Sequence, residues 1–191
     1  MFPAEHRALR ELHATTRQLA GHWAKLGDRL GGDTGALLDE GANAARVLLE
    51  ELEERVGELH GRPAAQAVGA RLAGARGVSD LLLERNQAFR SALLDLQHVT
   101  TLLAYAAELA RTRDDGSLAA WEDAWAERLR ALEERARVAA VALGTDPEGA
   151  IAPADESSMG RAGAKVGVAF GTIGEAIDNS PLGRLARRRA T

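Results

Sequence analysis

The chain has 191 residues, of which 46% are hydrophobic and 4% aromatic, and its formal net charge is −4. This length suits one domain with a hydrophobic core and a tail, and the negative charge argues against a body that binds nucleic acid through a general positive field. The chain contains no Cys, which excludes disulfides and thiolate metal sites. Charged residues interrupt the N-terminal segment where a signal peptide would be apolar, so we expect a cytoplasmic protein.

The first two predicted elements are amphipathic helices, because apolar residues recur at spacings of three and four. The first repeat runs Leu9, Leu12, Thr16, Leu19, Trp23, Leu26, Leu30, and the second runs Leu38, Ala42, Ala45, Leu49, Leu52, Val56, Leu59. Gly31 and Gly32 separate the two repeats. This short connection predicts an antiparallel hairpin, with Asp33 or Thr34 as the cap of the second helix.

Residues 63–77 form a poor helix by composition, because Gly69, Gly74 and Gly77 each disfavour it. We expect at most one extra short helix there, at 63–75, beginning near Pro63. Ser79 or Asp80 then caps a long third helix, whose repeat is Leu82, Asn86, Phe89, Leu93, Leu96, Thr100, Leu103, Ala107, Ala110.

A turn at residues 114–117 leads to the fourth long helix, whose repeat is Leu118, Trp121, Trp125, Leu129, Leu132, Ala136, Ala139, Leu143. The four repeats predict an all-α fold, an antiparallel four-helix bundle with coiled-coil-like packing over residues 1–145. The Trp residues of these repeats suit the core.

Three polar residues, Thr16, Asn86 and Thr100, fall on apolar stripes. They either fix the register of the helices or line a cavity. The alternative is that each Thr bonds to its own helix and that Asn86 lies at the end of the bundle.

One pair of residues is a weak candidate for metal binding. Asp95 and His98 stand three residues apart, which places a carboxylate and an imidazole on one helical face. The alternative is a polar stripe on a long helix. No catalytic residue is predicted, so the sequence favours a protein that is not an enzyme.

The opening segment, Glu5-His6-Arg7-Ala8-Leu9-Arg10-Glu11-Leu12-His13, resembles the first helix of hemerythrin-like bundles. The resemblance implies a ferritin- or hemerythrin-like bundle with iron as its cofactor. The His-x-x-x-Glu turn of that family has no counterpart here, because Ala64 follows His60 and Leu102 follows His98 at that spacing. The ligand set of the family is therefore not carried over.

The composition changes after the fourth helix. Residues 146–159 contain four acidic residues with Pro and Gly and are predicted to be a linker, and residues 160–191 form a Gly-rich tail with six basic and two acidic side chains. Gly163, Gly167 and Gly171 recur every four residues, so a partly helical tail would present a stripe for close helix packing. It would also suit an anionic surface; the alternatives are that it folds back on the bundle or is flexible.

The end of the tail contains Leu182, Gly183, Leu185, Arg187 and Arg188. An aliphatic residue followed by Gly, any residue, Leu and Arg is similar to the loading peptides that dock cargo proteins inside encapsulin shells. The resemblance implies that both Leu side chains enter apolar pockets while the arginines meet acidic groups. A basic tail that docks on nucleic acid or acidic lipid is the alternative.

Together these features predict a non-catalytic helical-bundle protein that acts by association with a protein partner or with itself, through the bundle and the tail. No cofactor and no sequence-specific contact with nucleic acid are predicted. The alternative is an encapsulin-type cargo, a divergent ferritin- or hemerythrin-like protein of iron or oxidative-stress metabolism.

Overall fold

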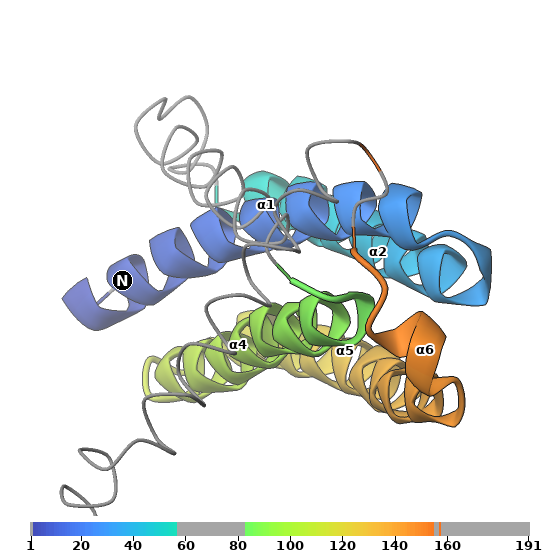
Figure 1. Ribbon diagram of the computed structural model, residues 1–191. Helices are drawn as coiled ribbons and strands as arrows, with labels where there is room; N and C mark the ends of the chain where they lie inside the picture. The colour runs from blue at the N-terminus through green and yellow to red at the C-terminus, as the bar shows by residue number, and fades with distance from the viewer. Residues whose placement is uncertain (1, 57–82, 155–156, 158–191) are drawn as a thin grey trace, which may run out of the picture.

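The computed structural model describes residues 2–56, 83–154 and 157. Within these residues four long helices form an antiparallel bundle: α1 (Pro3–Leu30), α2 (Gly32–Arg55), α4 (Arg85–Arg111) and α5 (Gly116–Ala142). The α1–α2 hairpin forms one layer and the α4–α5 hairpin the other (Figure 1). The predicted all-α fold and four-helix bundle are confirmed.

The two layers meet through α1 against α4 and α2 against α5. Contacts at the two ends of the bundle show that α1 and α4 run antiparallel. At one end the Arg113 guanidinium, just after α4, donates to the Glu5 carboxylate, and at the other end Arg85 donates to the carbonyl oxygen of Leu30. Helices α2 and α5 are also antiparallel, because Glu40 pairs with Arg135 and Glu51 with Trp121.

The helix boundaries follow local signals with two corrections. Gly31 adopts a φ of +61° between α1 and α2, a conformation that favours glycine. Helix α2 starts at Gly32 without a side-chain cap, so the expected cap at Asp33 or Thr34 is wrong. Helix α4 starts at Arg85, later than expected, and Ser79 and Asp80 lie outside the described residues.

The fourth helix begins as its sequence predicts. The Asp115 side chain accepts a hydrogen bond from the Leu118 backbone N–H at 3.0 Å, which satisfies one of the free amide groups of the first turn.

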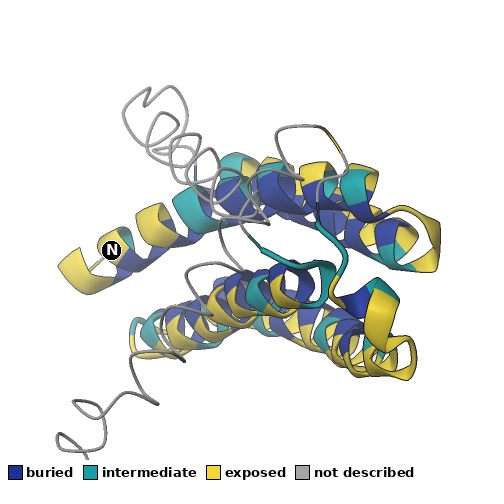
Figure 2. Ribbon diagram, viewed as in Figure 1, coloured by how far each residue is buried: buried dark blue, intermediate teal, exposed yellow. Residues whose placement is uncertain are grey.

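The core lies where the apolar stripes of the four helices converge, and the outer faces are exposed (Figure 2). Trp23 is fully buried, and Trp121 and Trp125 are buried with 8% and 4% exposure. Thr100 donates to the Leu96 carbonyl oxygen of its own helix at 2.8 Å. Asn86 lies at one end of the bundle and donates to the Ala150 carbonyl oxygen at 2.7 Å. Thr100 and Asn86 thus follow the alternative of a Thr bonded to its own helix and an Asn at the end of the bundle, whereas the buried Thr16 hydroxyl has no hydrogen-bond partner in the described residues.

A short 3-10 helix, η2 (Leu143–Thr145), and a single turn, α6 (Pro147–Ala150), follow α5. The chain then packs beside the start of α4: the Arg85 N–H donates to the Ala152 carbonyl oxygen, and Ala154 is 1% exposed. This part of the predicted acidic linker thus packs on the bundle. The extra helix expected at 63–75 and the tail at 160–191 lie outside the described residues.

Two glycines set how closely the helices approach. A Cβ on Gly35 would lie 2.6 Å from the Gly27 carbonyl oxygen, and a Cβ on Gly41 would lie 2.3 Å from Cε3 of Trp23. Because Gly41 has no side chain, the indole of Trp23 on α1 can pack directly against α2, near Leu132 of α5. Among the described helices, none combines the length and apolar character needed to cross a membrane.

Candidate functional site

The two residues of the predicted metal pair, Asp95 and His98, have different partners on α1 and differ in burial. Asp95 is buried, and its Oδ2 lies 2.9 Å from Nδ1 of His22 on α1. His98 is half exposed, and its Nε2 lies 3.2 Å from Oε1 of Glu11. The two candidate ligands thus face different partners. In the described part of the chain, no three His, Asp or Glu side chains are grouped so that they could hold a metal ion.

The buried polar side chains instead join one helix to another. His22 and Asp95 connect α1 to α4, and Gln18 Nε2 donates to Asp95 Oδ1 at 3.4 Å. His13 Nε2 lies 2.8 Å from Glu53 Oε1, which connects α1 to α2. Buried polar groups are tolerated when they are hydrogen-bonded, and pairs of this kind fix the register of neighbouring helices. Because the His22–Asp95 pair is enclosed, a substrate cannot reach it.

A second polar cluster lies at the end of the bundle where α1 begins. Arg113 donates to both oxygens of buried Glu5, and its Nη2 also lies 2.8 Å from Oδ2 of Asp115. Glu122 on α5 is fully buried, and neither of its oxygens has a hydrogen-bond partner in the described residues. Burial, together with the negative charges of Glu5, Asp123 and Asp115, raises the pKa of Glu122 to about 8. Its carboxyl group is therefore protonated at neutral pH.

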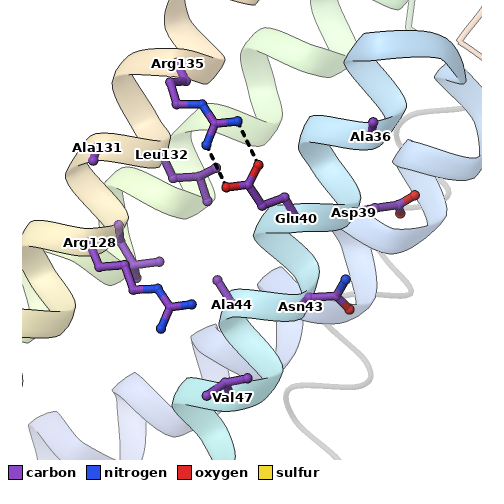
Figure 3. A pocket seen from close by; sticks show the side chains of 11 residues that line it. Ala36, Asp39, Glu40, Asn43, Ala44, Val47, Arg128, Ala131, Leu132 and Arg135 are labelled. Carbon is purple, nitrogen blue, oxygen red and sulfur yellow. Dashed lines mark hydrogen bonds and ion pairs between the residues drawn. The ribbon is translucent and has the colours of Figure 1, made fainter.

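In the described part of the chain, an accessible groove of about 740 Å³ lies between α2 and α5, and we call it the α2–α5 groove. Figure 3 shows both walls of the groove. From α2 it is lined by Ala36, Asp39, Glu40, Asn43, Ala44 and Val47, and from α5 by Arg128, Leu129, Ala131, Leu132 and Arg135. Its floor is apolar, because Ala44, Leu129 and Leu132 are buried there. Its volume falls in the usual range of ligand sites.

Two polar contacts link α2 to α5 along the groove. At one end the Arg135 guanidinium forms a bidentate pair with the Glu40 carboxylate, at 2.6 and 2.7 Å (Figure 3). At the other end Glu51 Oε2 accepts from Nε1 of Trp121 at 2.7 Å and from Nε1 of Trp125 at 2.8 Å. Glu40 and Glu51 stand eleven residues apart, about 16 Å along a helix. The Glu40–Arg135 pair belongs to the lining of the groove, whereas Glu51 lies one turn beyond Val47.

The electrostatics of the groove follow from these contacts. The hydrogen bond from Arg135 lowers the pKa of Glu40, and the hydrogen bonds from Trp121 and then Trp125 lower the pKa of Glu51. The positive charge of Arg128 also favours the ionised form of both carboxylates. Both acids are therefore ionised at neutral pH.

Arg128 is the prominent cation of the groove. Its guanidinium carbon lies 4.6 Å from the ring centroid of Trp125, in cation–π geometry. The side chain extends from α5 into the space beside Ala44 (Figure 3). A guanidinium over an indole keeps N–H groups available for an anionic group. The groove can therefore hold an apolar surface that carries a carboxylate.

The remaining predicted site residues lie outside the described part of the chain. They are the docking residues Leu182, Gly183, Leu185, Arg187 and Arg188 and the packing glycines Gly163, Gly167 and Gly171. The encapsulin resemblance, and iron as a cofactor, remain predictions.

The sequence reasoning missed the groove residues Glu40, Arg128 and Arg135 and the contact of Glu51 with two Trp side chains. One signal was present, because the charges at 128 and 135 stand two helical turns apart on one face. That spacing does not reveal which helix lies opposite.

No known protein-family model matches the chain, and no curated protein or solved structure matches it either.

Proposed function

We propose that this chain is a non-catalytic, cytoplasmic helical-bundle protein that acts by association, with the α2–α5 groove as its contact surface on the bundle and the C-terminal tail as a further docking element. The observation that carries the proposal is the groove itself, an accessible hollow over an apolar floor, with charged side chains of both signs along its walls. Contact surfaces commonly combine an apolar centre with a polar rim.

Three buried polar side chains support this proposal because they have structural partners. His13, His22 and Asp95 are buried and bond between helices, so they stabilise the bundle rather than offer a reactive surface. The groove, in contrast, combines exposed Val47 with charged side chains that contact solvent. An accessible patch of this composition suits binding.

A capture experiment tests the proposal with the full chain as bait. Arg128→Glu/Arg135→Glu reverses the basic wall, and a second variant lacks residues 158–191. The matched control, Arg130→Glu/Arg137→Glu, makes the same charge change on another face of α5, where these residues pair with Glu127 and Glu133.

We expect the unaltered chain and the control to retain the same partner, while the groove variant and the shortened chain bind it more weakly. A partner whose affinity is unchanged in both of these variants contradicts the proposal.

A further inference from the structure

A cluster of three charged side chains connects the start of α1 to the turn between α4 and α5. Arg113 donates to the Glu5 carboxylate from Nε at 3.1 Å and from Nη2 at 2.9 Å, and Nη2 also donates to Asp115 Oδ2 at 2.8 Å. The Glu5 carboxylate accepts a further hydrogen bond from the Phe2 backbone N–H at 3.2 Å. Because Glu5 is fully buried, separating it from Arg113 is favourable only if water replaces the guanidinium.

Glu122 is buried on α5 beside this cluster. Its side chain is fully enclosed, and in the described residues neither carboxyl oxygen has a hydrogen-bond partner. A neutral carboxyl group tolerates such a position far better than a carboxylate does, because an ionised group without a partner is much more costly to bury. The nearby guanidinium of Arg113 already pairs with two carboxylates, those of Glu5 and Asp115.

The charged groups at this end of the bundle come from all four long helices and from the α4–α5 turn. Among the described residues here, carboxylates outnumber guanidinium groups, so an ionised Glu122 adds to an excess of negative charge. The groups are Glu5 and His6 on α1, Glu51 and Arg55 on α2, Glu108 and Arg111 on α4, Arg113, Asp114 and Asp115 in the turn, and Asp123 on α5. Arg111 is paired with Glu108 and Asp123.

The start of α1 can move away from Glu122 with little loss of packing. Within residues 3–10, Glu5, Ala8 and Leu9 are the buried side chains, and Phe2 just before them is 47% exposed. Helix ends open more readily than helix centres. Release of these two turns would separate Glu5 from Arg113 and bring water to Glu122. An ionised Glu122 therefore favours the released form.

We propose that the proton on Glu122 controls the docking of α1: the protonated side chain lets residues 3–10 pack against the α4–α5 turn, and its ionisation favours their release into solvent. This inference goes beyond the proposed function and does not depend on the α2–α5 groove.

Proton linkage sets the pH range of the release. The pKa of Glu122 is about 8 while α1 is docked, and it returns towards the ordinary value of 4.5 once water reaches the carboxyl group. The equilibrium constant for release should therefore rise about tenfold per pH unit between these two values and level off above the docked-state pKa.

Hydrogen exchange of the full chain at pH 6, 7 and 8 measures this equilibrium constant. Each exchange rate is divided by the intrinsic rate at the same pH, which leaves the constant for opening. Backbone amides at 7–12 should open more readily than core amides at 96–103 on α4. Their opening constant should rise at least about thirtyfold from pH 6 to pH 8.

Three variants identify the group that titrates. Glu122→Gln should give an opening constant at 7–12 that does not change with pH, because the amide cannot ionise. Asp123→Asn removes a neighbouring negative charge and the partner of Arg111, so it should lower the pKa of Glu122 and reduce the rise from pH 6 to pH 8. Glu127→Gln, at an exposed position of the same helix, should retain the full rise.

Two results overturn the inference. One is a pH dependence at 7–12 that persists in Glu122→Gln or is absent from the unaltered chain. The other is an opening constant at 7–12 equal to that at 96–103 at every pH, because water would then reach Glu122 only when the whole bundle unfolds. Circular dichroism establishes that each variant is folded, and an Asp123→Asn chain with an unreduced rise also contradicts the inference.

Discussion

At the scale of single residues, the pKa of Glu122 stands far above its ordinary value. Charged groups approach it from Glu5 on α1, from Arg111 and Arg113 at the end of α4, and from Asp115 and Asp123 beside it. At this end of α2, Glu51 accepts a hydrogen bond from Trp121 Nε1, and the Arg55 guanidinium lies over the Trp121 ring. Glu122 itself is fully buried without a hydrogen-bond partner in the described residues, so its ionisation opposes folding.

This burial predicts a pH dependence of stability. The folded-state pKa of Glu122, about 8, lies above its ordinary value of 4.5, so its favourable contribution is complete below the ordinary pKa and disappears as pH rises through the folded pKa. Glu122→Gln removes this titration. The free energy of unfolding of the variant, relative to the unaltered chain, should rise between pH 5 and pH 9 by about 2–4 kcal/mol.

Urea unfolding of both chains at a series of pH values measures this difference. Glu127→Gln is the control, because Glu127 is exposed on the same helix. A stability difference between Glu122→Gln and the unaltered chain that stays constant with pH would show that Glu122 is ionised in the folded protein.

The metal candidates show what spacing can predict at this scale. Two residues three positions apart on a helix differ by about 60° around its axis, so Asp95 and His98 do share a broad face, as expected. This angle is nevertheless enough to bury Asp95 against α1 and to leave His98 half exposed. The neighbour of each side chain depends on the rotation of α1, which one helix's sequence does not specify.

At the scale of elements, the apolar repeats predicted the long helices because each repeat makes one helix face apolar over its whole length. The predicted helix boundaries were less accurate where tertiary contacts determine the residue at which a helix begins. Helix α4 begins at Arg85, beside the backbone of Ala152, a contact between residues far apart in sequence. The contact between Glu51 and two indoles depends likewise on the partner helix α5.

Removal of the contact between Glu51 and the two indoles should weaken the packing of α2 against α5. Glu51→Ala leaves the buried N–H groups of Trp121 and Trp125 without their acceptor, which costs about 1–3 kcal/mol for each unsatisfied group. We expect a lower free energy of unfolding at pH 7 and a red shift of the Trp emission as water reaches the indoles.

The decrease in the free energy of unfolding caused by Glu51→Ala should be smaller in acid. The pKa of Glu51 is lowered in the folded state, so its contribution is present above its ordinary value of 4.5 and declines as pH falls through the folded pKa. Urea unfolding at pH 7 and below pH 4 measures both effects. Glu50→Ala is the control, because exposed Glu50 is its neighbour; equal losses in the two variants would contradict a specific role for Glu51.

At the scale of the whole molecule, the bundle was predictable and the groove was not. Periodicity identifies which faces are buried, but it does not set the distance between α2 and α5. That distance depends on the small side chains Ala44 and Ala131, on Gly41 beneath Trp23, and on the flanking Glu40–Arg135 pair. The groove residues of α2 and α5 stand about 90 positions apart in the sequence, so no local pattern contains the contacts between them.

In the proposed function, the α2–α5 groove is the contact surface of the bundle. Site-specific photo-crosslinking in the cells that express the chain tests this placement directly. A photoreactive residue at Ala131 lies in the groove, and one at Gln97 lines a separate surface between α4 and α5. We predict that crosslinks to a second copy or to another partner form from position 131 and not from position 97. Equal crosslinking from both positions, or crosslinks from position 97 alone, would contradict the account.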